Sequence, residues 1–368
     1  MFGTRPEAIK LCPVVLEMRS RPEEFSVAVA VTAQHREMLD QVLSVFNVTP
    51  DYDLNVMSPG QTLAGLSARI IESLEPVLRE AKPEIVYVQG DTTTTLCGAL
   101  AAFYGQIPVG HIEAGLRTGD MGQPFPEEMN RVLTGKLSQI HFAATEGARK
   151  NLLREGVAPD SITVTGNSGI DALMQVRDRL VSGSLARQSF AFLDPAKRLI
   201  VVTAHRRESF GGGFESICAA LRAIAGRNDV EIVYPVHRNP NVAGPVNRNL
   251  AGIPGIHLID PLDYVPFVDL MTRAHILLTD SGGVQEEGPS LGKPVIVMRD
   301  KTERPEAVEA GTAILVGTDQ RRIAEEVDRL LDNGEARLAM TRIHNPYGDG
   351  RASRRIAGAT IAFFAARN

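Results

Sequence analysis

Short runs of β-branched and other apolar residues alternate with helical patterns along almost the whole chain. The apolar runs read as parallel strands buried on both faces. The patterns between them, such as "TLCGALAAFYG" and "FESICAALRAIAG", end at Gly, a common helix stop. The alternation predicts βαβ units and an α/β protein with helix-covered parallel sheets. The predicted strands are "FSVAVAVTA", "PEIVYVQG", "PVGHIEAG", "RLIVVTAH", "DVEIVYPVH", "GIHLIDP", "HILLTDSGG" and "PVIVMRD".

The predicted strands fall into two groups, separated by a segment with Gly, Ser and Asn near residues 166–170. We therefore predict two Rossmann-like, doubly wound domains, one over residues 1–168 and one over residues 169–345. Sheets of this kind bind ligands at the carboxyl ends of their strands, so two facing domains would enclose a cleft. The opening "FGTRPE" reads as a strand-to-helix turn with almost no strand before it. The first strand is then either stubby or truncated by the start site.

Composition narrows the class of protein. A chain of 368 residues is too long for one ordinary core and fits two domains. A formal charge of −5 argues against a nucleic-acid binder, which carries a basic excess. No apolar run is long enough to span a bilayer, and the start lacks a signal-peptide layout. Three cysteines in apolar helical runs, with no C-x-x-C pair, indicate reduced core residues in a cytoplasmic protein.

The first candidate site lies in "FGTRPEAIK". Gly3 makes the turn, Thr4 is the expected helix N-cap and Pro6 follows near the first helical position. Arg5 and Lys10 then lie in the first turns of the helix, and a helix N-terminus with two cations forms an anion site. The alternative is a solvated basic residue beside an ordinary capped helix.

Three carboxylates follow at predicted element ends. Asp91 comes between a strand and a helix, where an N-cap is the simpler interpretation from spacing alone. Glu113 ends the next strand, so both carboxylates should reach one sheet edge, where their pKa values can be pushed apart to give an acid and a base. Glu127 follows "PFP", and the alternative is that its charge simply complements the dipole of a helix N-terminus. Convergence of all three carboxylates on one edge of the predicted sheet favours an acid–base role for them.

The second half offers candidates for a phosphate site. His205 ends a strand and precedes two arginines and a glycine-rich loop, although a single His is more often structural. Ser281, Gly282 and Gly283 form a tight turn before a helix expected near Val284, where backbone N–H groups and the helix dipole favour phosphate. The alternative is an ordinary βα turn. Two further residues complete the set: Glu287, placed to take both hydroxyls of a ribose, and Arg304, another candidate anion contact.

These stretches together resemble one family, the non-hydrolysing UDP-N-acetylglucosamine 2-epimerases of bacteria. The resemblance runs from Phe2 to about the last helix, and the joint match is specific although no single motif is. Family members have a full first strand before "FGTRPE", so the start of this chain departs from the pattern. The matching motifs are "FGTRPEAIK", "GDTTTT", "HIEAGLRTGD", "PFPEEMNR", "AHRRESFG", "DYVPFVDLM", "DSGGVQEEGPSLGKPVIVMRDKTERPEAVEAGT" and "NPYGDGRAS".

The resemblance implies a GT-B-like fold with residues 346–368 forming a helix that packs back on the N-terminal domain. It implies reversible conversion of UDP-N-acetylglucosamine to UDP-N-acetylmannosamine, with no metal or other cofactor, for cell-surface polysaccharide biosynthesis. We also expect a homodimer. The catalytic residues carried over are Asp91, Glu113, Glu127 and His205; the substrate-binding residues are Arg5, Lys10, Phe267 at the uracil, Ser281, Gly282, Gly283, Glu287 and Arg304.

Some bacterial relatives bind a second UDP-N-acetylglucosamine as an activator, and Gln34, His35 and His237 resemble part of its lining. Three rival functions stay open at this point. A GT-B glycosyltransferase would need an acceptor site, a hydrolysing epimerase would release UDP, and a nucleotide-sugar sensor would bind without turnover.

Overall fold

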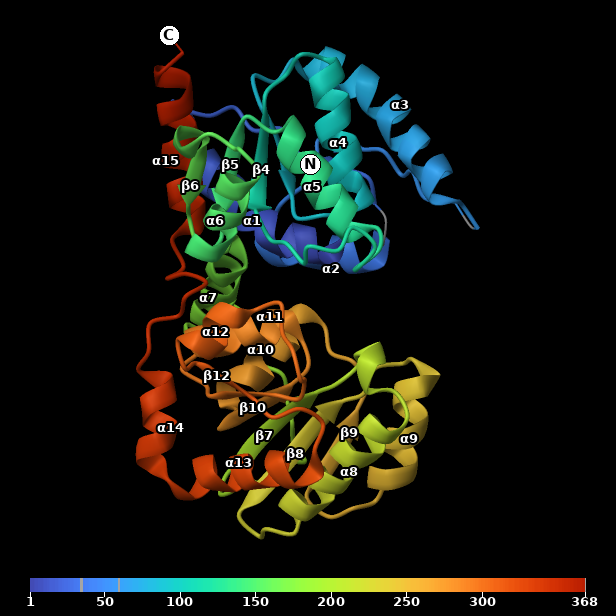
Figure 1. Cartoon of the computed structure of the whole chain (residues 1–368), viewed down its shortest axis with the longest axis vertical. Helices are drawn as coiled ribbons and strands as arrows, with labels where there is room; N and C mark the ends of the chain where they lie inside the picture. Colours follow the sequence, from blue (N-terminus) through green and yellow to red (C-terminus); the bar gives the residue numbers. More distant parts are fainter. Residues whose placement is uncertain (34–35, 59, 368) are drawn as a thin grey trace. The chain divides into compact units, whose positions relative to one another are not determined.

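The structure is a computed structural model that describes residues 1–33, 36–58 and 60–367. The chain divides into two compact units, which are described separately. Unit 1 comprises Met1–Ala172 and Tyr347–Asn368, and unit 2 comprises Leu173–Pro346. Helix α7 (Ser168–Val181) carries the chain from one unit to the other (Figure 1).

Unit 1 is built on parallel strands. A four-stranded sheet has the order β3-β4-β5-β6, and a short parallel pair, β1-β2, is separate from it over the described residues. Phe2 adds an isolated parallel bridge to Val31, so the segment before the first helix contributes one bridge rather than a longer strand. The strands are β1 (Ala30–Val31), β2 (Tyr52–Asp53), β3 (Val86–Gln89), β4 (Val109–Ala114), β5 (Ile140–Ala143) and β6 (Ile162–Val164).

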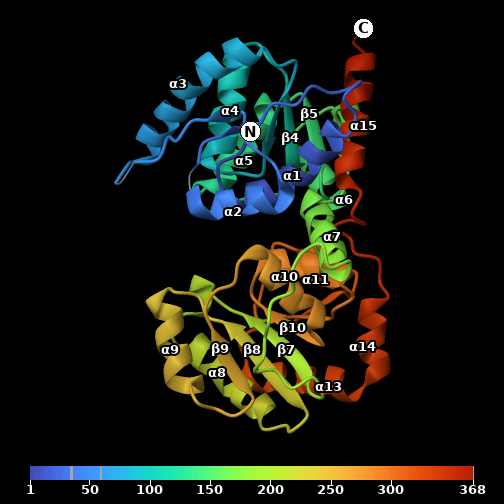
Figure 2. The same ribbon diagram turned by 180° about the vertical axis from the view of Figure 1, so that it is seen from behind.

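Helices cover both faces of the unit 1 sheet because its strands direct apolar side chains toward both faces. Val86 and Val88 of β3 pack on one side against alanines of α4, whereas Tyr87 between them donates or accepts a hydrogen bond with Thr360 of α15 at 2.6 Å. The C-terminal helix α15 packs along α1 (Figure 2). The helices are α1 (Arg5–Arg19), α2 (Arg36–Phe46), α3 (Leu63–Ala81), α4 (Thr93–Tyr104), α5 (Glu127–Leu137), α6 (Glu146–Arg154) and α15 (Ala352–Ala365).

Asp171 fixes the start of α15. Its carboxylate accepts hydrogen bonds from the backbone N–H groups of Ala352 at 3.1 Å and Ser353 at 2.8 Å. These N–H groups belong to the first turn of the helix and have no partner within it. The last segment of the chain is therefore tied to unit 1 by a buried carboxylate as well as by apolar packing.

Unit 2 contains a six-stranded parallel sheet of order β12-β11-β10-β7-β8-β9. Its main apolar core lies between the sheet and helices α8, α9 and α13, while α10, α11 and α12 cover the other face (Figure 1). The strands are β7 (Arg198–Thr203), β8 (Val230–Pro235), β9 (Ile256–Ile259), β10 (Ile276–Thr279), β11 (Val295–Val297) and β12 (Ala313–Leu315). The helices are α8 (Gly212–Ala225), α9 (Pro240–Leu250), α10 (Tyr264–Arg273), α11 (Gly282–Ser290), α12 (Pro305–Glu309), α13 (Gln320–Asp332) and α14 (Gly334–Thr341).

The predicted strands are present, with one difference in length. The run "FSVAVAVTA" forms only the two residues of β1, because its ladder partner β2 is equally short. Four further strands, β2, β5, β6 and β12, were not among the predicted ones. None of the described helices is both long and apolar enough to cross a membrane.

Candidate functional site

Asp91 and Glu113 stand at the same edge of the unit 1 sheet. β3 and β4 are neighbouring parallel strands, which confirms the predicted shared edge. Asp91 follows β3, whereas Glu113 lies one residue before the end of β4. The pairing of β4 with β5 shifts register between Ile112 and Ala114, and Glu113 has a φ of 64°. A non-glycine residue in this left-handed region is strained, and such strain is concentrated at functional sites.

Lys10 and two amides hold the carboxylate of Glu113. Lys10 Nζ lies 2.6 Å from Oε1 and 2.7 Å from Oε2. Asn167 Nδ2 donates to Oε1 at 3.0 Å, and Gln89 Nε2 donates to Oε2. Lys10, expected at an anion site with Arg5, is thus placed on a carboxylate of the protein itself.

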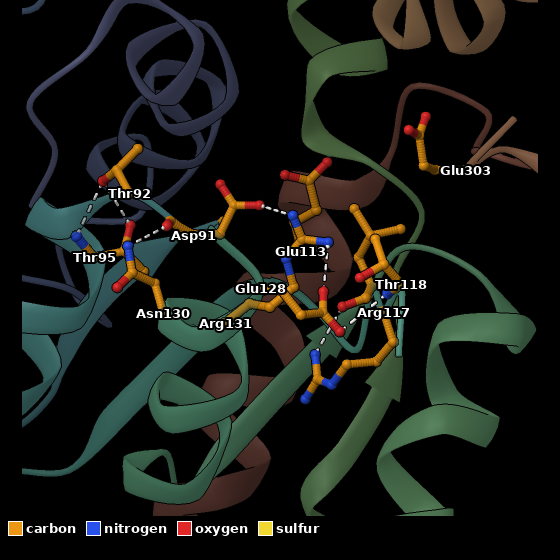
Figure 3. A network of polar contacts seen from close by, with 12 residues as sticks. Asp91, Thr92, Thr95, Glu113, Arg117, Thr118, Glu128, Asn130, Arg131 and Glu303 are labelled. Atoms are coloured by element: carbon orange, nitrogen blue, oxygen red, sulfur yellow. Dashed lines mark hydrogen bonds and ion pairs between the residues drawn. The ribbon is translucent and has the colours of Figure 1, made fainter. Parts of the chain in front are cut away.

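Asp91 is paired with a different cation. Arg131 Nη2 donates to Asp91 Oδ2 at 2.5 Å, and Asn130 Nδ2 donates to the Asp91 carbonyl at 2.9 Å (Figure 3). Burial raises the pKa of Asp91, Arg131 opposes that shift, and the charge of Glu113 adds to it. Each charged neighbour therefore affects whether this carboxyl group carries a proton.

The capping interpretation of Asp91 is wrong. The N-cap of α4 is Thr92, whose Oγ1 accepts a hydrogen bond from the backbone N–H of Thr95 at 3.1 Å. Asp91 lies one residue too early in the chain to be the N-cap, because the side chain of an N-cap must reach the N–H groups of the first turn. The Asp91 side chain is left to its ion pair with Arg131.

Two consecutive glutamates begin α5 and differ in their surroundings. Glu128 is buried, and its Oε1 accepts from the backbone N–H groups of Thr118 at 3.0 Å and Gly119 at 3.1 Å (Figure 3). It thereby holds the loop that joins β4 to α5. Glu127 is the first residue of the helix, and its charge is among those that raise the pKa of Asp91. The helix-dipole interpretation of Glu127 remains compatible with this position.

The N-cap at the start of α1 is the predicted residue. Thr4 is the N-cap of α1, Arg5 is the first helical residue and Pro6 the second. The sequence reasoning missed Glu7, which is 1% exposed and accepts hydrogen bonds from this loop. The spacing Thr4-x-x-Glu7 is that of a capping box, so the signal was present. It also missed Arg131, although Arg131 lies four residues after Glu127 and hence on the same helix face.

In unit 2, a buried aspartate organises the ends of the neighbouring strands β7 and β10. Asp280 Oδ2 accepts from the backbone N–H groups of His205 at 2.6 Å and Arg206 at 2.7 Å. His205 Nδ1 lies 3.4 Å from Asp280 Oδ1, and the His205 ring stacks on that of His237 at 5.6 Å between centroids. Partial burial lowers the pKa of His205, and Asp280 opposes this shift. Asp280 is a positioning group that the sequence reasoning did not single out.

The glycine turn leads directly into a helix. Ser281 is the N-cap of α11, which begins at Gly282, two residues earlier than predicted. A Cβ placed on Gly282 would lie 3.6 Å from Arg304 Cζ and 3.8 Å from Arg206 Nη2. Two guanidinium groups therefore approach a helix N-terminus, an arrangement that suits an anion. Arg304 is held there by an ion pair with Glu286.

Phe267 and Glu287 come from two helices of unit 2. Phe267 lies on α10 three residues after Tyr264, so the two rings share a helix face. The Tyr264 hydroxyl is buried with no hydrogen-bond partner in the described part of the chain. Burial raises the pKa of Tyr264, and the charge of Glu287 raises it further. The electrostatic contact indicates that the start of α10 lies near Glu287.

Titratable side chains in the described ranges form no group of three or more His, Cys, Asp or Glu that could hold a metal ion. The positive charges beside the candidate residues are instead those of Lys and Arg side chains. Of the possible activator residues, Gln34 and His35 lie outside the described residues.

Two parallel α/β units, with a basic helix N-terminus in one and paired carboxylates at strand ends in the other, define a GT-B-like protein of the sugar-nucleotide class. The chain belongs to the UDP-N-acetylglucosamine 2-epimerase family, whose sequence model matches residues 17–360. It is 60% identical over 361 residues to the UDP-N-acetylglucosamine 2-epimerase of Escherichia coli K12, covering 97% of this chain and 96% of the relative. The Salmonella typhimurium enzyme of the same name is 57% identical, with 99% and 98% covered.

Solved structures agree with this assignment. The UDP-GlcNAc 2-epimerase from Neisseria meningitidis bound to UDP-GlcNAc matches with a TM-score of 0.89 and 50% identity, covering 98% of each chain. The Methanocaldococcus jannaschii UDP-GlcNAc 2-epimerase in complex with UDP-GlcNAc and UDP matches with a TM-score of 0.78 and 35% identity, again covering 98% of each chain.

Arg131→Gln should raise the pKa of Asp91 further, because it removes the cation that opposes the effect of burial. The protonated form of Asp91 would then persist to higher pH. Carbon-13 NMR titration of the aspartate carboxyl groups measures this directly. Arg117→Gln is the matched control, since it removes the guanidinium that lowers the pKa of Glu155 in the same unit. An Asp91 titration unchanged by Arg131→Gln would contradict the electrostatic assignment.

Proposed function

We propose that this protein interconverts UDP-N-acetylglucosamine and UDP-N-acetylmannosamine by inverting C2 of the sugar. The observation that carries the proposal is the pair of carboxylates at the β3–β4 edge, each held by its own cation. Family membership supplies the substrate class. The GT-B glycosyltransferase and the non-catalytic sensor are less favoured, because the family is one of epimerases and the predicted carboxylates are present.

The chemistry explains why several carboxyl groups are needed. The C2 hydrogen is poorly acidic because no carbonyl is adjacent to C2. As the C1–O bond breaks, its electron pair leaves with UDP and positive charge develops at C1. A carboxylate then removes the C2 proton, and the C–H electrons form a C1–C2 double bond. Return of a proton to the opposite face and attack of a UDP oxygen on C1 complete the inversion, so donor and acceptor groups must face both sides of C2.

We assign this proton chemistry to Asp91, Glu113 and Glu127. Burial raises the pKa of Asp91, which favours its protonated form and suits it to the role of proton donor. We assign the acceptor role to Glu113, which Lys10 and two amides hold in one orientation. Glu127 is the third group and adds negative charge near Asp91.

The second group of residues is proposed to bind UDP. Ser281, Gly282 and Gly283 offer the N-terminus of α11, toward which Arg304 is directed. Negative charge grows on the diphosphate as the C1–O bond breaks, so cations and helix N–H groups stabilise the transition state. His205, Arg5 and Lys10 are assigned to diphosphate binding, Glu287 to the ribose and Phe267 to the uracil.

Three further assignments belong to this proposal. The protein is cytoplasmic, which its three free and buried cysteines support. Its product enters cell-surface polysaccharide biosynthesis. A second UDP-N-acetylglucosamine acts as an activator near His237, whose ring stacks on that of His205.

Incubation with UDP-N-acetylglucosamine in D₂O tests the reaction. A carboxyl group that exchanges with water between proton removal and return should leave deuterium at C2 of both epimers, visible by proton NMR. Free UDP should not accumulate at equilibrium, because it is added back to C1. Full retention of protium at C2 in the product would exclude the proposed proton transfer, and accumulation of UDP would indicate a hydrolysing epimerase.

Variants should separate proton transfer from UDP binding. Asp91→Asn, Glu113→Gln and Glu127→Gln should each lower kcat by about 10²-fold or more, the scale of acid–base catalysis, with a smaller change in UDP affinity. Arg5→Ala and His205→Ala should weaken UDP binding and slow turnover together, each contact contributing about 1.5–3 kcal/mol. Turnover assays, UDP titration calorimetry and melting temperatures distinguish these patterns. Near-normal kcat in all three carboxylate variants would leave the mechanism without its acids and bases.

A homodimer is proposed from the surface of α3 and α4. Phe103 and Tyr104 are 53% and 67% exposed at the end of α4, beside a groove lined by Ile71, Leu78 and Ile107. Large exposed apolar side chains that gather in one place indicate an interaction surface. Sedimentation velocity should give a dimer mass, and Tyr104→Glu should shift it toward a monomer. The matched control is Val181→Glu, since Val181 is 70% exposed on α7. A monomeric unaltered protein would refute the proposal.

A further inference from the structure

Glu7 is a buried carboxylate that the proposed mechanism does not use. It is 1% exposed and lies in the first turn of α1, between the loop that precedes Arg5 and the start of α4. A buried carboxylate is costly unless hydrogen-bond donors surround it. Within the described part of the chain its hydrogen-bond donors are neutral N–H and O–H groups, and no ion pair is formed.

One oxygen of Glu7 holds the N-terminal loop. Oε2 accepts from the backbone N–H of Gly3 at 3.1 Å, from the backbone N–H of Thr4 at 2.8 Å and from Thr4 Oγ1 at 2.7 Å. These contacts fix the backbone immediately before Arg5. They satisfy N–H groups at the helix start that would otherwise lack partners.

The other oxygen reaches the start of α4. Thr92 Oγ1 donates to Glu7 Oε1 at 2.8 Å. Thr95 Oγ1 lies 3.2 Å from the same oxygen, but its single proton has a closer acceptor in the Gln89 carbonyl at 2.6 Å. The bond from Thr92 is therefore the direct link. Thr92 uses its proton for Glu7 and a lone pair for the N–H of Thr95, so the helix cap and the link share one hydroxyl.

We propose that Glu7 is a positioning residue. Through its hydrogen bond with Thr92 it holds the loop immediately before Arg5 and the segment that contains Asp91 in one fixed geometry. Asp91 directly precedes Thr92, so a shift of that hydroxyl moves the backbone of the carboxylate. The kinetic consequence rests on the proposed function, whereas the link between the two segments does not. Small displacements of a catalytic group can cost about 10²-fold in rate.

A competing explanation needs no carboxylate. Gly3 is closely packed, because a Cβ on it would lie 2.0 Å from Thr32 Oγ1 and 2.6 Å from Thr94 Oγ1. Packing of Gly3 alone could hold the loop against α4. The two explanations differ for Thr92→Val, which removes the hydroxyl but leaves Gly3, Thr32 and Thr94 untouched.

Amide hydrogen exchange followed by mass spectrometry tests the link without any turnover. Thr92→Val should increase exchange several-fold both in peptides spanning Asp91–Thr95 and in peptides spanning Gly3–Thr4, although Thr92 makes no backbone contact with that loop. Thr92→Ser, which keeps the hydroxyl, should restore protection. Asp319→Ala is the matched control for loss of an N-cap, because Asp319 caps α13 in unit 2. Unchanged exchange at Gly3–Thr4 in Thr92→Val would overturn the proposal.

Kinetics test the consequence for catalysis. Thr92→Val removes the hydroxyl that donates to Glu7 and should lower kcat about 10-fold or more, with KM changed less than about 3-fold. Thr92→Ser keeps the hydroxyl and should restore kcat. Wild-type kcat in Thr92→Val, or no recovery in Thr92→Ser, would overturn the positioning role. An unaltered protein without epimerase activity would refute the proposed function and leave the exchange experiment to decide the link.

Discussion

The ion pair between Lys10 and Glu113 is the interaction on which the arrangement of unit 1 depends. Glu113 sits at an irregular point of β4 with a left-handed backbone, which costs on the order of 1–3 kcal/mol. Its side chain is 13% exposed and that of Lys10 is 22% exposed, so both charges are largely removed from water. A buried charge that loses its partner costs several kcal/mol. The pair thus ties α1 to β4 and holds a strained carboxylate at the sheet edge.

The same requirement shapes the rest of the acidic edge. Asp91 is paired with Arg131, and Glu128 receives two backbone N–H groups as well as lying 3.3 Å from Arg131. Each carboxylate therefore has a different set of hydrogen-bond donors and cations around it.

Unit 2 has the opposite arrangement of charges. At the end of β10 it brings together a helix N-terminus and the guanidinium of Arg304, which the buried Glu286 holds. Asp280 takes the N–H groups of His205 and Arg206, and Glu286 holds Arg304. The acids in this unit position cations and N–H groups, whereas the cations in unit 1 position acids.

Local pattern alone determined that the chain is α/β and where many of its strands and helices lie. Apolar runs and helix stops predicted five of the six strands of the unit 2 sheet and two of the four strands of the unit 1 sheet, because burial on two faces demands continuous apolar sequence. Only the tertiary structure decided which groups pair. Lys10 and Glu113 are 103 residues apart, Arg131 and Asp91 are 40 apart, and Glu7 and Thr92 are 85 apart. Spacing placed Asp91 as a helix cap, but the backbone gave that place to Thr92. Such contacts depend on how strands pair and helices pack over the sheet, and no local pattern records that geometry.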